Sequence, residues 1–325
     1  MTSNSNLPGP DSSAPSPAPS ADAKASAAIV KVFLGPNGIR AGWRLLIFLA
    51  LFAIIGFGLS QIIRHIPAAH AMLHQAQAAQ VLAPVPQTIG EGLNVVVLLI
   101  CAFIMTKIEK RSFADYGLPA RGAFGKKFWL GIPYGFAMLS LLLALIAAGH
   151  GLSLDGLALH GAAAVKYGVV WAIGFVLVGV FEEFSFRGYM QATLTTGMGF
   201  WPAAILLGIL FGAIHLGNSG EAIWGAIMAG SFGVLAAFSL FRTGSIWFAI
   251  GMHAAWDWAE TYFYGVPDSG LLAQGHLFNS SSHGARWLTG GTVGPEGSYI
   301  ALGVLGLAAI GIHFLFPARQ IAPQQ

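Results

Sequence analysis

Two adjacent glutamates and an arginine interrupt an apolar part of the chain. Glu182, Glu183 and Arg187 follow the apolar run 169–180, in a chain with only 13 acidic residues among 325. A charged side chain near the centre of a bilayer costs about 2.5–3.5 kcal/mol on insertion scales, so such groups usually face the bundle interior and mark function. On a helix, Glu183 and Arg187 stand one turn apart and can neutralise each other. Glu182 is left without a partner in its own helix.

Further ionisable side chains occur inside later apolar segments. His215 follows Phe211 by one helical turn, and His253 and Asp257 share one helix face at a spacing of four. Taken singly, each fits a packing residue or an internal hydrogen bond that fixes a histidine tautomer. Packing explains less well why three apolar segments each carry such groups. The ionisable residues inside these segments are Glu182, Glu183, Arg187, His215, His253, Asp257 and Glu260, with His313 near the end of the last apolar segment.

These residue types suit hydrolysis of an amide bond in or beside a membrane. A desolvated Glu182 can act as general base toward water, and one histidine could share that water. The second histidine with Asp257 could stabilise the oxyanion of a tetrahedral intermediate. Zinc is the alternative, because imidazole nitrogen and carboxylate oxygen are its ligands. The signatures His-Glu-x-x-His and Gly-x-Gly-Asp of other intramembrane proteases are absent from the sequence.

The composition indicates a polytopic membrane protein. Charged residues make up 9% and hydrophobic residues 55%, and the mean hydropathy is +0.69. Apolar runs of about 20 residues recur, as transmembrane helices require, whereas the short alternating segments of a membrane barrel are absent. The net charge of +3 comes from loop residues and predicts no nucleic-acid partner. We predict an all-α bundle of about eight transmembrane helices, at 43–63, 88–107, 128–149, 167–186, 201–217, 221–241, 245–264 and 299–317.

The basic residues predict the orientation. With the amino terminus inside, 13 of the 16 Lys and Arg residues fall in cytoplasmic segments, and only Arg64, Lys166 and Arg286 lie outside. Both termini are therefore predicted to be cytoplasmic, and we expect a multi-pass protein of the cell (inner) membrane. Residues 1–30 are rich in Ser, Pro and Ala and are predicted to be a disordered tail. Residues 31–325 are predicted to form a single membrane domain.

Small residues predict close contacts between the later helices. Such residues let membrane helices approach closely. The glycine- and serine-rich loop 265–298 could cap the bundle, and its sequence shows no metal-ligand spacing. The small residues that predict contacts are a pair on the fifth span, Gly208 and Gly212, and a ladder on the sixth, Gly225, Ala229, Gly233 and Ala237.

One inconsistency follows from these boundaries. Counting 1.5 Å per residue along straight helices places Glu182 and His253 in the cytoplasmic half of the membrane. His215, counted from a helix start at Trp201, falls nearer the far side. Either the fifth helix is tilted or starts deeper, or its predicted boundary is wrong.

The three motifs together resemble the membrane-embedded CAAX-protease and bacteriocin-processing family, also called the Abi or type II CAAX prenyl endopeptidase family. That family carries Glu-Glu-x-x-x-Arg, then Phe-x-x-x-His, then His-x-x-x-Asn or Asp, on successive helices. This chain has the three motifs in the same order at 182–187, 211–215 and 253–257. The resemblance covers about residues 167–260, the expected catalytic core.

The resemblance implies an eight-helix bundle and a glutamate-dependent intramembrane endopeptidase. It implies that Glu182 and His215 activate water, while His253 and Asp257 form the oxyanion site. The implied partners are the lipid bilayer and a substrate protein or peptide that is embedded in or anchored to the membrane. The residues expected to support the site structurally are Glu183, Arg187 and Phe211.

One position departs from the pattern of the eukaryotic prenyl-protein members, which carry Asn where this chain has Asp257. Asn can donate a hydrogen bond to an oxyanion, whereas an ionised Asp cannot. Asp257 must therefore be protonated, act through His253 or bind a metal. The last option keeps Zn²⁺ open as a cofactor, with Glu182, His215, His253 and Asp257 as ligands.

Two other functions use the same residues. The chain could be a catalytically silent immunity or scaffold protein of the same family. It could also be a proton-coupled transporter, in which the buried acids and histidines carry protons. Transporters commonly show two related halves and broken helices, and neither is evident in this sequence.

Overall fold

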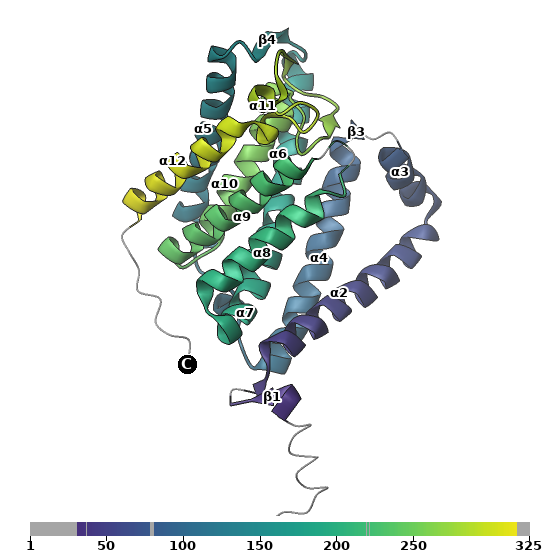
Figure 1. Cartoon of the computed structure of the whole chain (residues 1–325). Coiled ribbons are helices and arrows are strands. Elements are labelled where there is room, and N and C mark those ends of the chain that lie inside the picture. The colour runs from purple at the N-terminus through teal and green to yellow at the C-terminus, as the bar shows by residue number, and fades with distance from the viewer. Residues whose placement is uncertain (1–30, 37, 79–80, 219, 221, 317–325) are drawn as a thin grey trace, which may run out of the picture. The chain divides into compact units, whose positions relative to one another are not determined.

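The computed structural model (Figure 1) describes residues 31–36, 38–78, 81–218, 220 and 222–316. The predicted tail, residues 1–30, lies outside this described part. The chain divides into one unit that ends at Arg40 and a second that begins at Ala41. In the first unit, β1 (Leu34–Gly35) pairs antiparallel with β2 (Gly38–Ile39). The predicted site residues all lie in the second unit.

Every predicted span is helical in the structure. Among the described residues, five helical stretches are long and apolar enough to cross a membrane, and two further apolar helices are shorter. The fold is therefore an all-α membrane bundle, while the number of eight spans stays a prediction. The helices at the predicted spans are α2 (Ala41–Arg64), α4 (Pro84–Glu109), α5 (Lys126–Ala148), α6 (Gly161–Glu183), α8 (Phe200–His215), α9 (Ile223–Thr243), α10 (Trp247–Trp258) and α12 (Tyr299–Leu315).

The fourth helical stretch is longer than predicted. α6 continues through the π-helix η2 (Phe184–Met190) into α7 (Gln191–Met198), so the predicted end at residue 186 is wrong. The stretch ends at Gly199, whose φ of 83° favours glycine, and α8 then runs back along it (Figure 1).

The longer helical stretch removes the difference in membrane depth that the predicted boundaries gave for Glu182 and His215. Glu182 lies about 25 Å before the turn at Gly199, and His215 lies about 24 Å after it, at 1.5 Å per helical residue. The two side chains therefore reach similar depths on neighbouring segments.

α10 is the central helix of the bundle. All its residues from 247 to 257 are buried, which fits a helix that is apolar on every side. It packs against α5 and α6. On α5, a Cβ at Gly131 or at Gly135 would overlap the α10 backbone, in the second case at the carbonyl oxygen of Met252. The two backbones can touch only because these positions lack side chains.

The predicted glycine pair on α8 contacts α9. A Cβ at Gly212 would overlap the carbonyl oxygen of Ala226, and one at Gly208 would stand 2.9 Å from that of Gly230. The face of α9 that meets α8 is therefore displaced by one residue from the predicted ladder. Gly233 of that ladder does lie at the contact, because its Cβ position is 3.5 Å from the Cα of Gly208.

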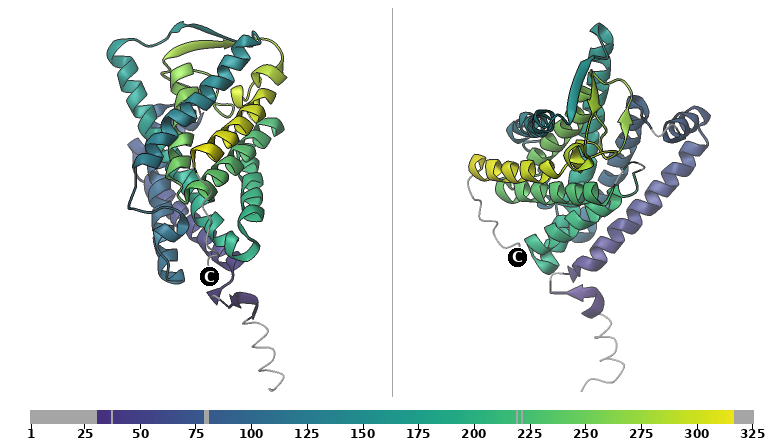
Figure 2. Two further views of the ribbon diagram at one scale, coloured as in Figure 1. Left: turned by 90° about the vertical axis from the view of Figure 1, so that its left-hand side faces the viewer. Right: turned by 45° about the horizontal axis from the view of Figure 1, so that its top comes forward.

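The loop 265–298 lies across the ends of the helices. Its strand β6 (Phe278–Ser282) pairs antiparallel with β4 (Leu152–Leu157), which joins α5 to α6. Figure 2 shows this pair at the same end of the bundle as the rest of the loop. The remaining short elements are α3 (Pro67–Ala78), β3 (Val81–Leu82) paired parallel with β5 (Leu272–Ala273), η1 (Phe113–Tyr116), η3 (Ala259–Tyr264), α11 (Arg286–Thr289) and η4 (Pro295–Gly297).

The contact between α5 and α10 can be tested with Gly135→Ala. We expect the added methyl to lower the free energy of unfolding by about 1–3 kcal/mol, the usual cost of overpacking, because it would overlap Met252. Gly303→Ala on α12 is the matched control, since nothing lies within 4 Å of its Cβ position. Thermal unfolding in one detergent, followed by tryptophan fluorescence, compares the two variants. Equal melting temperatures would contradict the close contact.

Candidate active site

A cavity of about 240 Å³ lies among α4, α6, α8, α9, α10 and the loop 265–298. Its lining includes the aromatic side chains of Phe175, Phe211 and Phe232. The site is thus a small cavity that polar and aromatic side chains line together. The four predicted catalytic residues all line it, namely Glu182, His215, His253 and Asp257.

His253 lies between three carboxylates. Its Nδ1 is 2.8 Å from Oε1 of Glu183, and its Nε2 is 3.7 Å from Oε2 of Glu182 and 3.6 Å from Oδ2 of Asp257. A carboxylate only accepts hydrogen bonds, so Nδ1 carries a hydrogen and donates it to Glu183. The distances to the other two carboxylates exceed hydrogen-bond length and suit a bridging water or substrate atom.

The partner that sets the tautomer of His253 differs from the one that the spacing predicted. The i,i+4 spacing allowed a tautomer-fixing hydrogen bond with Asp257 as one interpretation, but the short contact is with Glu183 on α6. The reason is the packing of α10 on α6, which presents Nδ1 to one helix and leaves Nε2 facing the cavity. Asp257 can then interact with a water or substrate atom that binds at Nε2 of His253.

The predicted pair of Glu183 and Arg187 forms and is fully enclosed. Nη1 of Arg187 is 3.3 Å from Oε1 of Glu183, and the two side chains are 3% and 0% exposed. The guanidinium carbon lies 4.2 Å from the ring centroid of Phe211, within the range of a cation–π interaction. Nε donates to the carbonyl oxygen of Gly233 at 3.2 Å. The phenylalanine of the second motif thus supports the arginine of the first.

His215 presents its other nitrogen to the cavity. Its Nδ1 is 2.8 Å from the carbonyl oxygen of Phe211, one turn earlier on α8. A carbonyl oxygen only accepts, so Nδ1 is the donor and Nε2 of the neutral ring is left as an acceptor. Oε2 of Glu182 is buried and has no hydrogen-bond partner among the described residues. Glu182 and His215 therefore both line the cavity with an acceptor atom that makes no hydrogen bond within the described part of the chain.

The predicted zinc ligands do not fit a zinc ion in this arrangement. Zinc in proteins takes at least three side-chain ligands at about 2.0–2.2 Å when these are nitrogen and oxygen. Within the described part of the chain, no three of the four predicted ligands bring their donor atoms within 4.8 Å of one another. We therefore derive the chemistry of the site without zinc.

Several polar residues of the cavity were not predicted from the sequence. Gln87 and Glu91 of α4 line it, as do Asp268 and Glu296 of the loop 265–298. Burial and the neighbouring Glu296 raise the pKa of Asp268 to about 7. Glu91 could have been found, since it is a carboxylate inside the predicted span 88–107. The two loop residues carry no such signal, because a loop sequence does not show which side chains turn inward.

The adjacent glutamates form a matched pair for a test of stability. Glu183→Gln removes the charge from a buried pair and leaves Arg187 uncompensated, so we expect a loss of about 3–5 kcal/mol. Glu182→Gln makes the same chemical change one residue earlier, where the side chain is 23% exposed and its Oε2, 3.7 Å from Nε2 of His253, makes no hydrogen bond. It should unfold like wild type. Chemical or thermal unfolding in detergent measures both. Equal losses of stability in the two variants would contradict separate roles for Glu182 and Glu183.

The comparison with known families agrees with the geometry. Residues 164–259 match the family model described as Type II CAAX prenyl endopeptidase Rce1-like, and the matched segment contains all three motifs. No curated protein and no solved structure matches the chain. The long apolar helices and the matched family indicate an integral membrane protein. The matched family is one of intramembrane endopeptidases. The chain therefore carries, at residues 164–259, a domain of the Rce1-like type II CAAX prenyl endopeptidase family.

Proposed function

We propose that this protein is an intramembrane endopeptidase that uses Glu182 as its general base and cleaves a peptide bond of a membrane-embedded or membrane-anchored substrate. The observation that carries the proposal is the convergence of Glu182, His215, His253 and Asp257 from three helices on one cavity. Packing alone gives no reason for four such groups to face one enclosed volume.

In this mechanism Glu182 and His215 activate the water. Oε2 of Glu182 has no hydrogen-bond partner among the described residues, and Nε2 of His215 is an acceptor. A water between them donates one hydrogen to each, and Glu182 takes a proton as the water oxygen attacks the carbonyl carbon. The tetrahedral intermediate then collapses, the carbon–nitrogen bond breaks, and the leaving nitrogen receives that proton from Glu182.

His253 is the group that stabilises the oxyanion in this mechanism. Nδ1 is committed to Glu183 at 2.8 Å, so a doubly protonated ring directs Nε2–H into the cavity. Glu183 and Asp257 on either side of the ring favour its positive charge. Asp257, 3.6 Å from Nε2, therefore acts through His253 and need not donate a hydrogen bond itself. A preorganised donor of this kind gains strength in an enclosed site of low dielectric.

A second cavity supports a substrate that comes from the bilayer. It has a volume of about 530 Å³, lies between α2 and α4, and is lined mainly by apolar side chains. It shares Leu82, Gln87, Glu91 and Leu271 with the first cavity. An apolar segment held between these helices would place an adjacent peptide bond near Glu182.

The general base is tested with Glu182→Gln. We expect cleavage to fall by a factor of about 10²–10⁴, the usual contribution of a positioned base, while membrane insertion is unchanged. Because the substrate is unidentified, the measurement is a survey of new protein N-termini in membranes that contain the wild type or the variant. Asp155→Asn, an exposed acid on β4, is the control for loss of one charge. Fragments that persist with Glu182→Gln would refute the assignment.

The role of Asp257 is tested with two substitutions. Both Asp257→Asn and Asp257→Ala remove the charge that favours the positively charged ring of His253, so each should lose a factor of about 10²–10³, as when one oxyanion donor is removed. The same fragment survey, repeated as a time course, gives the rates. Cleavage by Asp257→Asn within about tenfold of wild type would contradict this account, because a neutral donor would then suffice at this position.

Phenanthroline, a chelator of zinc, separates the two mechanisms. Because the site lacks a compact set of zinc ligands, we expect wild-type cleavage to continue at an unchanged rate in its presence. Loss of cleavage that added zinc restores would establish the metal mechanism instead.

A further inference from the structure

A group of three carboxylates lies beside the catalytic residues. Glu260 belongs to η3, directly after α10, whereas Asp268 and Glu296 belong to the loop 265–298. One oxygen of each lies within 4.8 Å of one oxygen of the other two. Asp268 and Glu296 also line the catalytic cavity. The group is distinct from the predicted zinc ligands and shares no residue with them.

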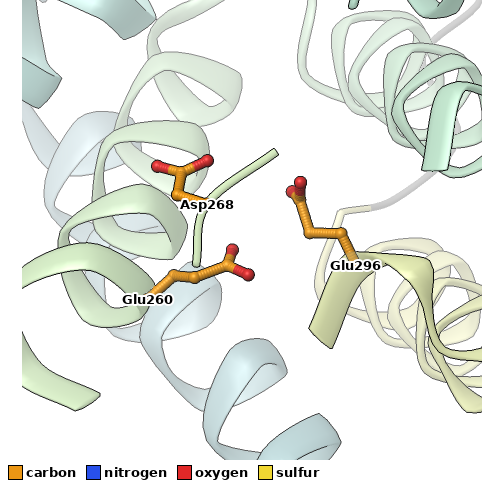
Figure 3. Close-up of side chains that lie close together, drawn as sticks. All are labelled: Glu260, Asp268 and Glu296. Carbon is orange, nitrogen blue, oxygen red and sulfur yellow. The ribbon is translucent and has the colours of Figure 1, made fainter. Parts of the chain in front are cut away.

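Glu260 supplies an independent sign that a ligand belongs here. The residue is 0% exposed, and neither of its carboxylate oxygens has a hydrogen-bond partner among the described residues. Figure 3 shows its carboxylate directed toward the space between Asp268 and Glu296. A fully buried acid without a partner is rare, because such groups are normally hydrogen-bonded or paired. Its orientation leaves the space between the three acids as the place for that partner.

The surrounding donors hydrogen-bond the other two acids, and the Trp256 indole also lies near Glu260 without making a hydrogen bond of normal geometry to it. Trp256 donates to Oε1 of Glu296 at 3.0 Å, and Ser269 donates to Oε2 of the same residue at 2.7 Å. Thr261 donates to Oδ2 of Asp268 at 2.8 Å. All three donors are neutral. In the described part of the chain, no Lys or Arg nitrogen lies within 4.0 Å of these carboxylates.

The backbone holds the loop acids in this position. A Cβ at Gly294 would overlap the carbonyl oxygen of Pro267, so η4 packs directly against the residue before Asp268. Gly294 has a φ of 101°, which a residue with a side chain rarely adopts. The amide of Gly270 also donates to the carbonyl oxygen of Val293 at 2.8 Å. The two acids are thus brought together by a tightly packed loop.

We propose that Glu260, Asp268 and Glu296 bind a calcium ion that fastens the loop 265–298 to the end of α10. Ligands that are all oxygen select hard cations such as Ca²⁺ and Mg²⁺ over zinc. Calcium binds oxygen at 2.3–2.6 Å, so oxygens on opposite sides of one ion stand about 4.6–5.2 Å apart. Magnesium at 2.0–2.1 Å requires about 4.0–4.2 Å and a strict octahedron. All three ligands here are protein carboxylates, whereas magnesium usually binds one or two carboxylates and keeps several waters, so this set favours calcium.

The ion would have two effects on the neighbouring site. It would neutralise negative charge next to Asp257, and it would hold the cavity wall that Asp268 and Glu296 form. These effects are structural, so calcium binding does not require that the protein cleave anything. The binding measurement is therefore independent of the proposed proteolysis.

The test is calcium binding to the full chain in detergent after treatment with EDTA. Isothermal titration with CaCl₂ should give one site per chain, and the melting temperature should rise and saturate as the site fills. Glu260→Gln should lower the affinity for calcium at least about tenfold, since the charge and number of ligands set this affinity. Glu296→Gln, in the loop, should do the same and serves if the buried substitution prevents folding.

Two controls make the result specific. Asp155→Asn removes an exposed acid on β4 and should leave calcium binding unchanged. Glu182→Gln should also bind calcium like wild type, which separates this site from the general base. The proposal is overturned if the wild type shows no saturable calcium binding, if Glu260→Gln and Glu296→Gln bind as tightly as wild type, or if MgCl₂ titrates the site more tightly than CaCl₂.

Discussion

The site depends on one buried carboxylate, that of Glu183. It lies 3.3 Å from the guanidinium of Arg187 and 2.8 Å from Nδ1 of His253, and it is fully enclosed. An ionised carboxylate is tolerated there because its Oε1 contacts both Arg187 and His253. The contact joins α6 to α10 and turns Nε2 of His253 toward Glu182. The neighbouring glutamates can therefore have opposite roles, one bound in the structure and one facing the cavity.

Missing side chains let other helices of the bundle around this contact approach one another closely. Gly131 and Gly135 allow α5 to touch the backbone of α10, and Gly212 allows α8 to touch α9. At Gly233 a Cβ would overlap the guanidinium of Arg187, so the arginine occupies space that a larger residue would fill. The glycines thus leave the space in which the charged group of Arg187 is buried.

The cavity is completed by segments that are far apart in the chain. α4 contributes Glu91, and the loop 265–298 contributes Asp268 and Glu296. Carboxylates consequently outnumber the basic groups around His253, and this excess favours a positively charged imidazole and a bound cation. The charges of the cavity residues and of the loop 265–298 act on one another, although the loop lies outside the matched segment 164–259.

The sequence by itself determined the features that depend on residues close together in the chain. Apolar runs of membrane length predict the helices, and the i,i+4 spacing predicts the pair of Glu183 and Arg187, because both follow from the geometry of a single helix. Tertiary structure decided which carboxylate holds His253, which face of α9 meets α8, and that the fourth helical stretch runs on to Met198. It also brought Glu260 together with Asp268 and Glu296. Such contacts depend on helix rotation and loop packing, which local periodicity does not encode.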